Sequence, residues 1–517
     1  MKATPAQAVL AAALTALLYI PGLAFSPPHL LHDEIKFALQ AESIAETGRD
    51  LNGRLLAVYF PEPGYSVGRD PVCIYVTAGV LAWLPLSEAS IRLPSALVGA
   101  LGVGLIFALA RSLFARAATA WIVAAILALT PTYFIHSRLA LSVIYPVPFV
   151  VLWLIALRRY LAAPHATTGA ICGAILGLGV YSYLGSVLMM PLYLAVTVVV
   201  LASRRDWRAA ALPVASFAVV LIPIVLWQIV QPDRYTDIVS AYHLLEGRRG
   251  PGPSLVDAVA TAIGPRADTY WQTFDPGRLF FTGDSSLHIS TREVGTFLLP
   301  VAALLAIGIV ALVREGPSAI GAVLLVGLVS APLPAVIMAD VEVRRWLVVT
   351  PFVAIIAGYG VERLWQSGVA SRTACVLLLA AMPWQFALFA RDYFGPYRER
   401  ASFWFGGNIR AAFEATLDDI GAGSPPTVYI SGDIPWVEAY WRFYVTARHQ
   451  HGLIAHAQYL RFETDPVPAA VPGAFAVVPA QNTAAVQALE RAGWVPRHRI
   501  PDLDGKPSFV IYGPSRV

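Results

Sequence analysis

The first residues able to carry chemistry are His32-Asp33-Glu34, which follow an uncharged, largely apolar stretch over 3–28. A carboxylate at the mouth of a membrane helix is partly desolvated, which raises its proton affinity and suits it to act as a general base. A second interpretation is structural, because Asp33 can be the N-cap of the amphipathic stretch 34–46. The two interpretations are compatible, since a cap also fixes the position of the residue.

Arginines at two further places could bind an anion. Arg138 ends the run His136-Ser137-Arg138, and Arg344 and Arg345 are adjacent in a short charged segment. The guanidinium fork binds two oxygens of a phosphate and keeps its charge at all relevant pH values. For Arg138 the alternative is that the side chain extends to the lipid headgroups. Arg344 and Arg345 are the stronger candidates, because they lie on the side that is otherwise poor in positive charge.

Aromatic and polar side chains recur near the same predicted helix ends. Tyr181 and Tyr183 are candidates for binding substrate, although tyrosines at this depth also form the aromatic belt of membrane proteins. The segment 270–292 interleaves aromatic residues with Asp284 and His288, which is unusual for a plain connector. His288 could bind phosphate or a metal ion, or it could be a hydrogen-bonded loop histidine.

Composition indicates which elements must position these residues. Of 517 residues, 57% are hydrophobic and 14% are charged, against about 25% charged residues in ordinary soluble domains. The charges are clustered and leave uncharged runs long enough to cross a bilayer once or twice. Soluble enzymes and nucleic-acid-binding proteins are therefore excluded, and the net charge of +4 is too small to imply a polyanionic partner. Cys73, Cys172 and Cys375 have no metal-binding spacing and are expected to be packing residues.

The apolar runs predict a polytopic α-helical membrane protein with about eleven spans. We expect the first span to be an uncleaved helix, because no clear small-residue cleavage site follows it. The distribution of arginine between the loops places the N-terminus in the cytoplasm if the run 71–87 lies outside the bilayer core as an interfacial or re-entrant helix. The predicted spans are 6–25, 92–113, 118–136, 143–161, 167–186, 187–202, 209–230, 294–313, 318–338, 346–365 and 373–390.

Three large elements then lie on the extracytoplasmic side of the cytoplasmic (inner) membrane. The loop 26–91 is expected to hold short helices, and its Tyr59 either covers a cleft or anchors the loop in the interface. The loop 231–293 is the second element. The region 391–517 is the third, and it is expected to follow the membrane domain 1–390 and to contain a small α/β domain. That domain is predicted to have strands near 427–431, 475–478 and 508–512 and a helix near 483–492.

Taken together, these motifs resemble the GT-C superfamily of polyprenyl-phosphate-sugar-dependent glycosyltransferases, which includes protein O-mannosyltransferases and lipid A aminoarabinose transferases (the glycosyltransferase family 39 type). The resemblance extends over about residues 1–400. Where many members have a second acidic residue, this chain has Ser142. The motifs that carry the resemblance are His32-Asp33-Glu34, Ser90-Ile91-Arg92-Leu93-Pro94-Ser95, His136-Ser137-Arg138-Leu139-Ala140, Tyr181-Ser182-Tyr183, the stretch from Phe274-Asp275-Pro276 to Gly283-Asp284, and Arg344-Arg345.

The resemblance implies roles for these residues. Asp33 would be the catalytic base, with Glu34 supporting it. The donor phosphate would be held by Arg138, Arg344, Arg345 and His288. The substrate would be contacted by Tyr181, Tyr183, Asp284 and Tyr59.

The implied activity is transfer of a sugar, with inversion, from a polyprenyl-phosphate carrier to the hydroxyl of a lipid, glycan or protein acceptor. The carrier phosphate is a good leaving group and needs positive charge rather than a strong general acid. The sequence leaves open whether a divalent metal takes part. Two alternatives remain at this point: a transporter or flippase of lipid-linked sugars, and a non-catalytic GT-C homologue that acts in envelope assembly.

Overall fold

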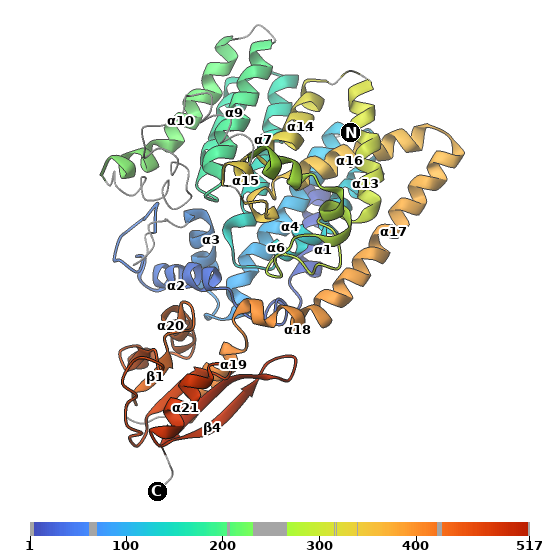
Figure 1. The fold of residues 1–517 in the computed structure, drawn as a ribbon. Helices are drawn as coiled ribbons and strands as arrows, with labels where there is room; N and C mark the ends of the chain where they lie inside the picture. The colour runs from blue at the N-terminus through green and yellow to red at the C-terminus, as the bar shows by residue number, and fades with distance from the viewer. Residues whose placement is uncertain are drawn as a thin grey trace, which may run out of the picture.

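A computed structural model describes residues 5–60, 70–203, 207–230, 266–314, 316, 318–338, 340–420 and 426–514. The parts of the predicted outer loops at 61–69 and 231–265 lie outside the described residues. Figure 1 shows a large helical domain with a smaller domain of helices and strands at one end. The N-terminus lies at the opposite end of the helical domain from the smaller, C-terminal domain.

Each of the eleven predicted spans contains a helix. Their apolar residues extend around the whole helix circumference, as expected of segments that contact either other helices or lipid. Among the described residues, six helical segments are long and apolar enough to cross a membrane. The helices are α1 (Pro5–Tyr19), α4 (Glu88–Leu113), α5 (Ala117–Ala128), α7 (Pro146–Ala162), α8 (Ala166–Val180), α9 (Ser186–Ser203), α10 (Trp207–Val230), α13 (Leu299–Arg314), α14 (Ala319–Ser330), α16 (Val349–Gln366) and α17 (Val369–Tyr393).

Glycines allow some of these helices to pack at very short distances. A Cβ atom on Gly308 of α13 would lie 1.9 Å from the carbonyl oxygen of Ile356 on α16. A Cβ on Gly360 of α16 would in turn lie 2.0 Å from the carbonyl oxygen of Leu304. Membrane helices often pack closely through small residues. Lipid tails are as apolar as the side chains, so the helices associate through van der Waals contacts rather than through the hydrophobic effect.

Shorter elements lie at the helix ends on the side of the C-terminal domain. The run 71–87, which is predicted to lie outside the bilayer core, contains the eleven-residue helix α3 (Pro71–Leu81). It packs against α2 (His32–Thr47), which connects the first membrane helix to it. The remaining short elements are α6 (Pro131–His136), η1 (Ser142–Ile144), η2 (Arg278–Thr282), α15 (Leu333–Ile337) and η3 (Val343–Arg345).

The C-terminal domain is an α/β domain, as the sequence predicts. Its five-stranded sheet has the order β2-β1-β3-β5-β4; β1 pairs parallel with β2 and β3, whereas β5 pairs antiparallel with β3 and β4. The predicted strands and helix correspond to β1, β3, β5 and α21, whereas β2 and β4 were not predicted. The elements are α18 (Pro396–Ser402), η4 (Phe403–Phe405), α19 (Ile409–Ile420), β1 (Val428–Ser431), α20 (Val437–Ala447), η5 (His451–Ile454), β2 (Ala457–Leu460), β3 (Phe475–Pro479), α21 (Thr483–Arg491), β4 (Trp494–Pro501) and β5 (Pro507–Pro514).

Candidate active site

Asp33 lies in the first turn of α2. The helix begins at His32, and the preceding residue, Leu31, is extended. The cap is made by Glu34, whose Oε2 accepts a hydrogen bond of 2.9 Å from the Leu31 N–H. The prediction that Asp33 is the N-cap is therefore wrong, and its carboxylate is not used for that purpose. The Asp33 side chain is 31% exposed, and the positive end of the helix dipole favours its ionised form.

Glu34 is buried and organises the backbone around Asp33. Arg92 of α4 forms a two-pronged ion pair with it, with Nε 2.8 Å from Oε1 and Nη2 3.0 Å from Oε2. Oε1 also accepts from the Ala140 N–H at 2.8 Å. Because both oxygens are fully used and the side chain is not exposed, Glu34 can support Asp33 only by holding α2 in place.

Arg138 has a different environment from the one that phosphate binding requires. Its guanidinium is buried and donates to the backbone carbonyls of residues at the end of α1 and just after it. The acceptors are the carbonyl oxygens of Tyr19, Pro21 (2.8 Å), Gly22 (2.8 Å) and Ser26 (2.9 Å). We therefore assign Arg138 to the structure of this loop and leave it out of the donor site.

Arg344 is partly exposed on η3, and Arg345 is mostly buried beside it. Arg345 Nε lies 2.7 Å from Asp340 Oδ2, and its Nη1 donates to the Tyr183 hydroxyl at 3.2 Å. Arg344 Nε lies 2.5 Å from Glu342 Oε2, and the Arg344 side chain is 38% exposed. The structure thus brings Tyr183 to Arg345, one of the two arginines predicted here to bind phosphate.

The two carboxyl groups beside these arginines differ in pKa. For Asp340, burial alone would raise the pKa, but hydrogen bonds from Arg345 and from the Glu342 N–H lower it below its ordinary value. For Glu342, burial raises the pKa and outweighs the effect of Arg344, with repulsion from Asp340 and Asp284 adding to the rise. Glu342 is therefore the weaker of the two anionic partners.

Asp284 fixes the position of η3 from a neighbouring loop. It is buried, and its Oδ2 accepts from the Val343 N–H at 3.0 Å and also pairs with Arg278. Its Oδ1 accepts from the Ser286 N–H at 3.2 Å. These bonds occupy the carboxylate, so Asp284 positions the arginine segment and does not face a substrate.

His288 lies in the loop that precedes α13 and packs against η4. Its Nε2 is 2.5 Å from the carbonyl oxygen of Trp404, so this nitrogen must carry the proton. Burial lowers the pKa of His288 and outweighs the Trp404 hydrogen bond, which raises it. Arg344 lowers the pKa further, against smaller raising effects of Glu34 and Asp33. The neutral ring has its one N–H already bonded, so it offers no positive charge or free donor to a phosphate.

The other predicted aromatic contacts pack away from the arginine segment. The Tyr181 hydroxyl donates to the Val220 carbonyl at 2.8 Å. Tyr59 is buried, and its ring centroid lies 4.1 Å from that of Trp227 on α10. Of the four residues predicted to contact substrate, Tyr183 alone thus bonds to a predicted phosphate-binding residue.

The C-terminal domain contributes residues that the motifs did not identify as part of the site. Trp436 stacks on His32, with ring centroids 5.6 Å apart, and the Nζ of Lys36 lies 3.6 Å from the centroid of the same indole. Tyr440 donates from its hydroxyl to the Leu30 carbonyl at 2.9 Å. The signal available in the sequence was a cluster of aromatic residues at 436–444, whose composition also fits a packed core.

Among the described residues, no three His, Cys, Asp or Glu side chains are grouped to hold a metal ion. We therefore derive no step through a metal. The three cysteines are buried and free, as predicted for packing residues.

Comparisons with known proteins agree with this architecture. Residues 68–228 match the family model described as dolichyl-phosphate-mannose-protein mannosyltransferase. The structure is similar to that of ArnT from Cupriavidus metallidurans bound to undecaprenyl phosphate, with a TM-score of 0.58 and 16% identity, over 99% of this chain and 98% of that one. The apo state of the same protein gives a TM-score of 0.57 and 16% identity, over 98% and 97% of the two chains.

An oligosaccharyltransferase of Archaeoglobus fulgidus, crystallised in complex with Zn and sulfate, is also similar. It has a TM-score of 0.50 and 13% identity, over 98% of this chain and 72% of that one. No match is found among curated protein sequences. The resemblance predicted from the motifs is confirmed, and the chain has the polytopic membrane fold of the GT-C glycosyltransferases.

Proposed function

We propose that the protein transfers a sugar from a polyprenyl-phosphate carrier to an acceptor hydroxyl, with Asp33 as the general base. The observation that carries the proposal is that two partly exposed groups of opposite charge, Asp33 on α2 and Arg344 on η3, are connected through neighbouring elements. The helix α3 packs on α2, and its Val72 N–H donates to the Tyr181 carbonyl at 3.3 Å, two residues before the Tyr183 that bonds to Arg345. The similarity to a protein crystallised with undecaprenyl phosphate supports a carrier of this class.

The proposed reaction needs one proton transfer and one displacement. Asp33 accepts the proton of the acceptor hydroxyl while the hydroxyl oxygen forms a bond to the anomeric carbon of the sugar. The bond between that carbon and the phosphate oxygen breaks, and polyprenyl phosphate leaves with the electron pair. Attack from the side opposite the leaving group inverts the anomeric centre, as in other displacements by a base-activated nucleophile.

The arginine segment stabilises the negative charge that develops on the leaving phosphate. Arg345 is held by Asp340 and Tyr183. Arg344 is more exposed and pairs closely with the weaker anion Glu342, and more distantly with Asp340, at 3.6 Å. We expect the donor phosphate to take the place of Glu342 on Arg344. The Arg345–Asp340 pair then remains as the support of the segment.

The orientation follows from the basic residues at the other end of the helices. Arg111, Arg158 and Arg159 line one cavity together with Pro5 at the start of α1. Arg314 and Arg363 share another cavity at helix ends. By the positive-inside rule we assign these ends to the cytoplasm, which places Asp33 and the C-terminal domain on the extracytoplasmic side of the cytoplasmic membrane.

The experiment measures release of polyprenyl phosphate from a synthetic polyprenyl-phosphate sugar by the purified protein in the presence of cell-envelope acceptors. We expect release by the wild type and a loss of at least about a hundredfold in Asp33→Asn, the scale of a general base. Asp418→Asn is the matched control, because Asp418 is an exposed carboxylate on α19. Full activity of a folded Asp33→Asn variant would remove the assignment, and binding of the donor without release would favour the transporter alternative.

A further inference from the structure

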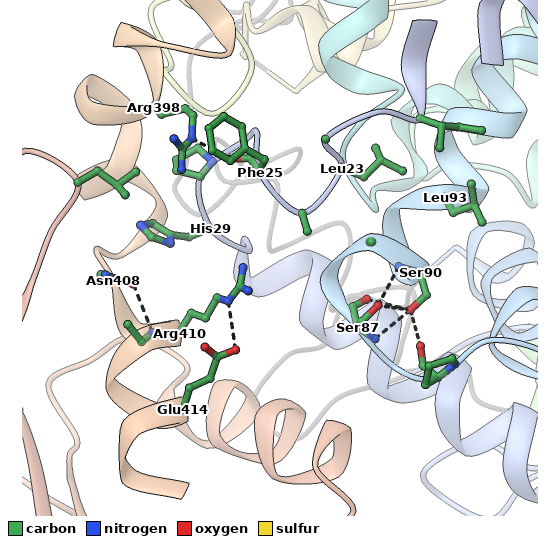
Figure 2. A pocket seen from close by; sticks show the side chains of 18 of the residues that line it. Leu23, Phe25, His29, Ser87, Ser90, Leu93, Arg398, Asn408, Arg410 and Glu414 are labelled. Atoms are coloured by element: carbon green, nitrogen blue, oxygen red, sulfur yellow. Dashed lines mark hydrogen bonds and ion pairs between the residues drawn. The ribbon is translucent and has the colours of Figure 1, made fainter. Parts of the chain in front are cut away.

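A groove separates the C-terminal domain from the ends of α1 and α4, and none of the proposed reaction's residues lines it. Its volume is about 780 Å³, within the range of about 300 to 1,000 Å³ typical of ligand sites. Figure 2 shows Arg398, His29 and Arg410 along one side and Leu23, Ser90 and Leu93 along the other. We propose that this groove binds an anionic phospholipid of the surrounding bilayer, with its phosphate on Arg398.

The groove continues a strip of the surface that faces lipid. On α1, Leu10, Leu14 and Leu17 are 50%, 52% and 73% exposed and lie on one helix face at spacings of four and three. On the adjacent α4, Leu97 and Leu101 are exposed on the face that also carries Leu93. Ile20 and Leu93 then line the groove itself. An acyl chain can therefore extend along this strip while the headgroup lies in the groove.

Arg398 is the cation that is available to a headgroup. Arg410 is neutralised by two carboxylates, with Glu88 at 3.3 Å and Glu414 at 3.2 Å. Among the described residues, Arg398 has no carboxylate within 4 Å of its guanidinium nitrogens. Its Nε donates to the Phe25 carbonyl at 2.9 Å, and its guanidinium lies 3.5 Å from the centroid of the Phe25 ring. These contacts fix the side chain and leave both terminal nitrogens as donors to a phosphate.

His29 gives this side of the groove a second polar group. Its Nε2 bonds to the Ser402 hydroxyl at 2.8 Å, and that hydroxyl donates in turn to Asp502. The other ring nitrogen, Nδ1, has no hydrogen-bond partner among the described residues. The polar side of the groove therefore faces the apolar side chains of Leu23 and Leu93. This arrangement suits a phospholipid, whose phosphate can bind the polar side while the start of an acyl chain contacts the leucines.

The test is native mass spectrometry of the full-length protein titrated with phosphatidylglycerol or phosphatidylcholine. We expect the wild type to bind one phosphatidylglycerol in preference to phosphatidylcholine, and Arg398→Ala to bind it about tenfold more weakly, since one charge-assisted contact is lost. Arg391→Ala is the control, because Arg391 is an exposed arginine at the end of α17 that does not line the groove. It should bind as the wild type does.

A second variant tests the groove without touching its charge. Ala89→Trp fills the space beside Ser90 while Arg398 is retained, and it should also weaken phosphatidylglycerol binding about tenfold. The proposal would be overturned if Arg398→Ala and Ala89→Trp both bound phosphatidylglycerol as tightly as the wild type does. It would also be overturned if the wild type bound phosphatidylglycerol and phosphatidylcholine equally well. Binding is measured without any sugar donor, so the result is independent of the proposed transfer reaction.

Discussion

Replacing Arg92 alone by an uncharged residue should destabilise the protein more than replacing both Arg92 and Glu34 by uncharged residues. In Arg92→Met, the buried carboxylate of Glu34 loses both ion-pair contacts and keeps the Leu31 and Ala140 N–H groups. Loss of one partner of a buried ion pair costs about 3 to 5 kcal/mol, because the remaining charge is uncompensated. In the double variant Arg92→Met with Glu34→Gln, no unpaired charge remains at this site, so the part of the cost that comes from the unpaired carboxylate should disappear. The carbonyls of Leu23, Pro27 and His29 lose their Arg92 donor in both variants, so the double variant stays below the wild type.

The assay is thermal unfolding of the four proteins in one detergent, followed by the fluorescence of the thirteen tryptophans. We expect the melting temperature of Arg92→Met to be the lowest, with the double variant between it and the wild type. The Glu34→Gln variant leaves the Arg92 charge buried and should also melt below the double variant. Strict additivity of the two single changes would refute the argument, because it would mean that the pair does not interact in the folded state.

Three further predictions follow from particular contacts. Gly308→Ala should lower the melting temperature, since overpacking costs about 1 to 3 kcal/mol and the added Cβ meets the Ile356 carbonyl; Gly79→Ala, which meets nothing, is the control. The pKa of His288 is lowered in the folded state, so its contribution to stability is present above about pH 6.5 and is lost at lower pH. The wild type should therefore lose more stability than His288→Gln between pH 7 and pH 5 in unfolding experiments. Arg138→Lys should destabilise the protein, because one ammonium has three donors for four carbonyls.

The helices were predictable because the apolar runs report directly on burial in a membrane. Each predicted span contains a helix, and the run at 71–87 contains the eleven-residue helix α3. In the C-terminal domain, β1, β3 and β5 were predicted from their short apolar runs. By contrast, β4 is mostly exposed and polar, with the sequence WVPRHRIP, so its pattern does not indicate a strand.

The site was harder to predict, because similar arginines have different environments. Arg138 and Arg344 both come from the predicted outer face, and the resemblance implies phosphate binding for each. The structure surrounds Arg138 with backbone carbonyls and leaves Arg344 partly exposed among carboxylates. The difference depends on the course of residues 19–26, which lie more than a hundred positions away from Arg138 in the chain. Local spacing carries no information about such a contact.

The segment between α1 and α2 explains why buried arginines are needed here at all. From residue 20 to residue 31 the backbone is not helical, so most of its carbonyls, and that of Tyr19 at the end of α1, lack the partners that a helix supplies. Near a membrane, water does not replace these partners. Arg138 donates hydrogen bonds to four of these carbonyls. Arg92 donates to three more, those of Leu23, Pro27 and His29. Because Arg92 also pairs with Glu34, the same contacts that satisfy the segment fix the first turn of α2. The position of Asp33 therefore depends on two arginines that contact neither Asp33 nor a substrate.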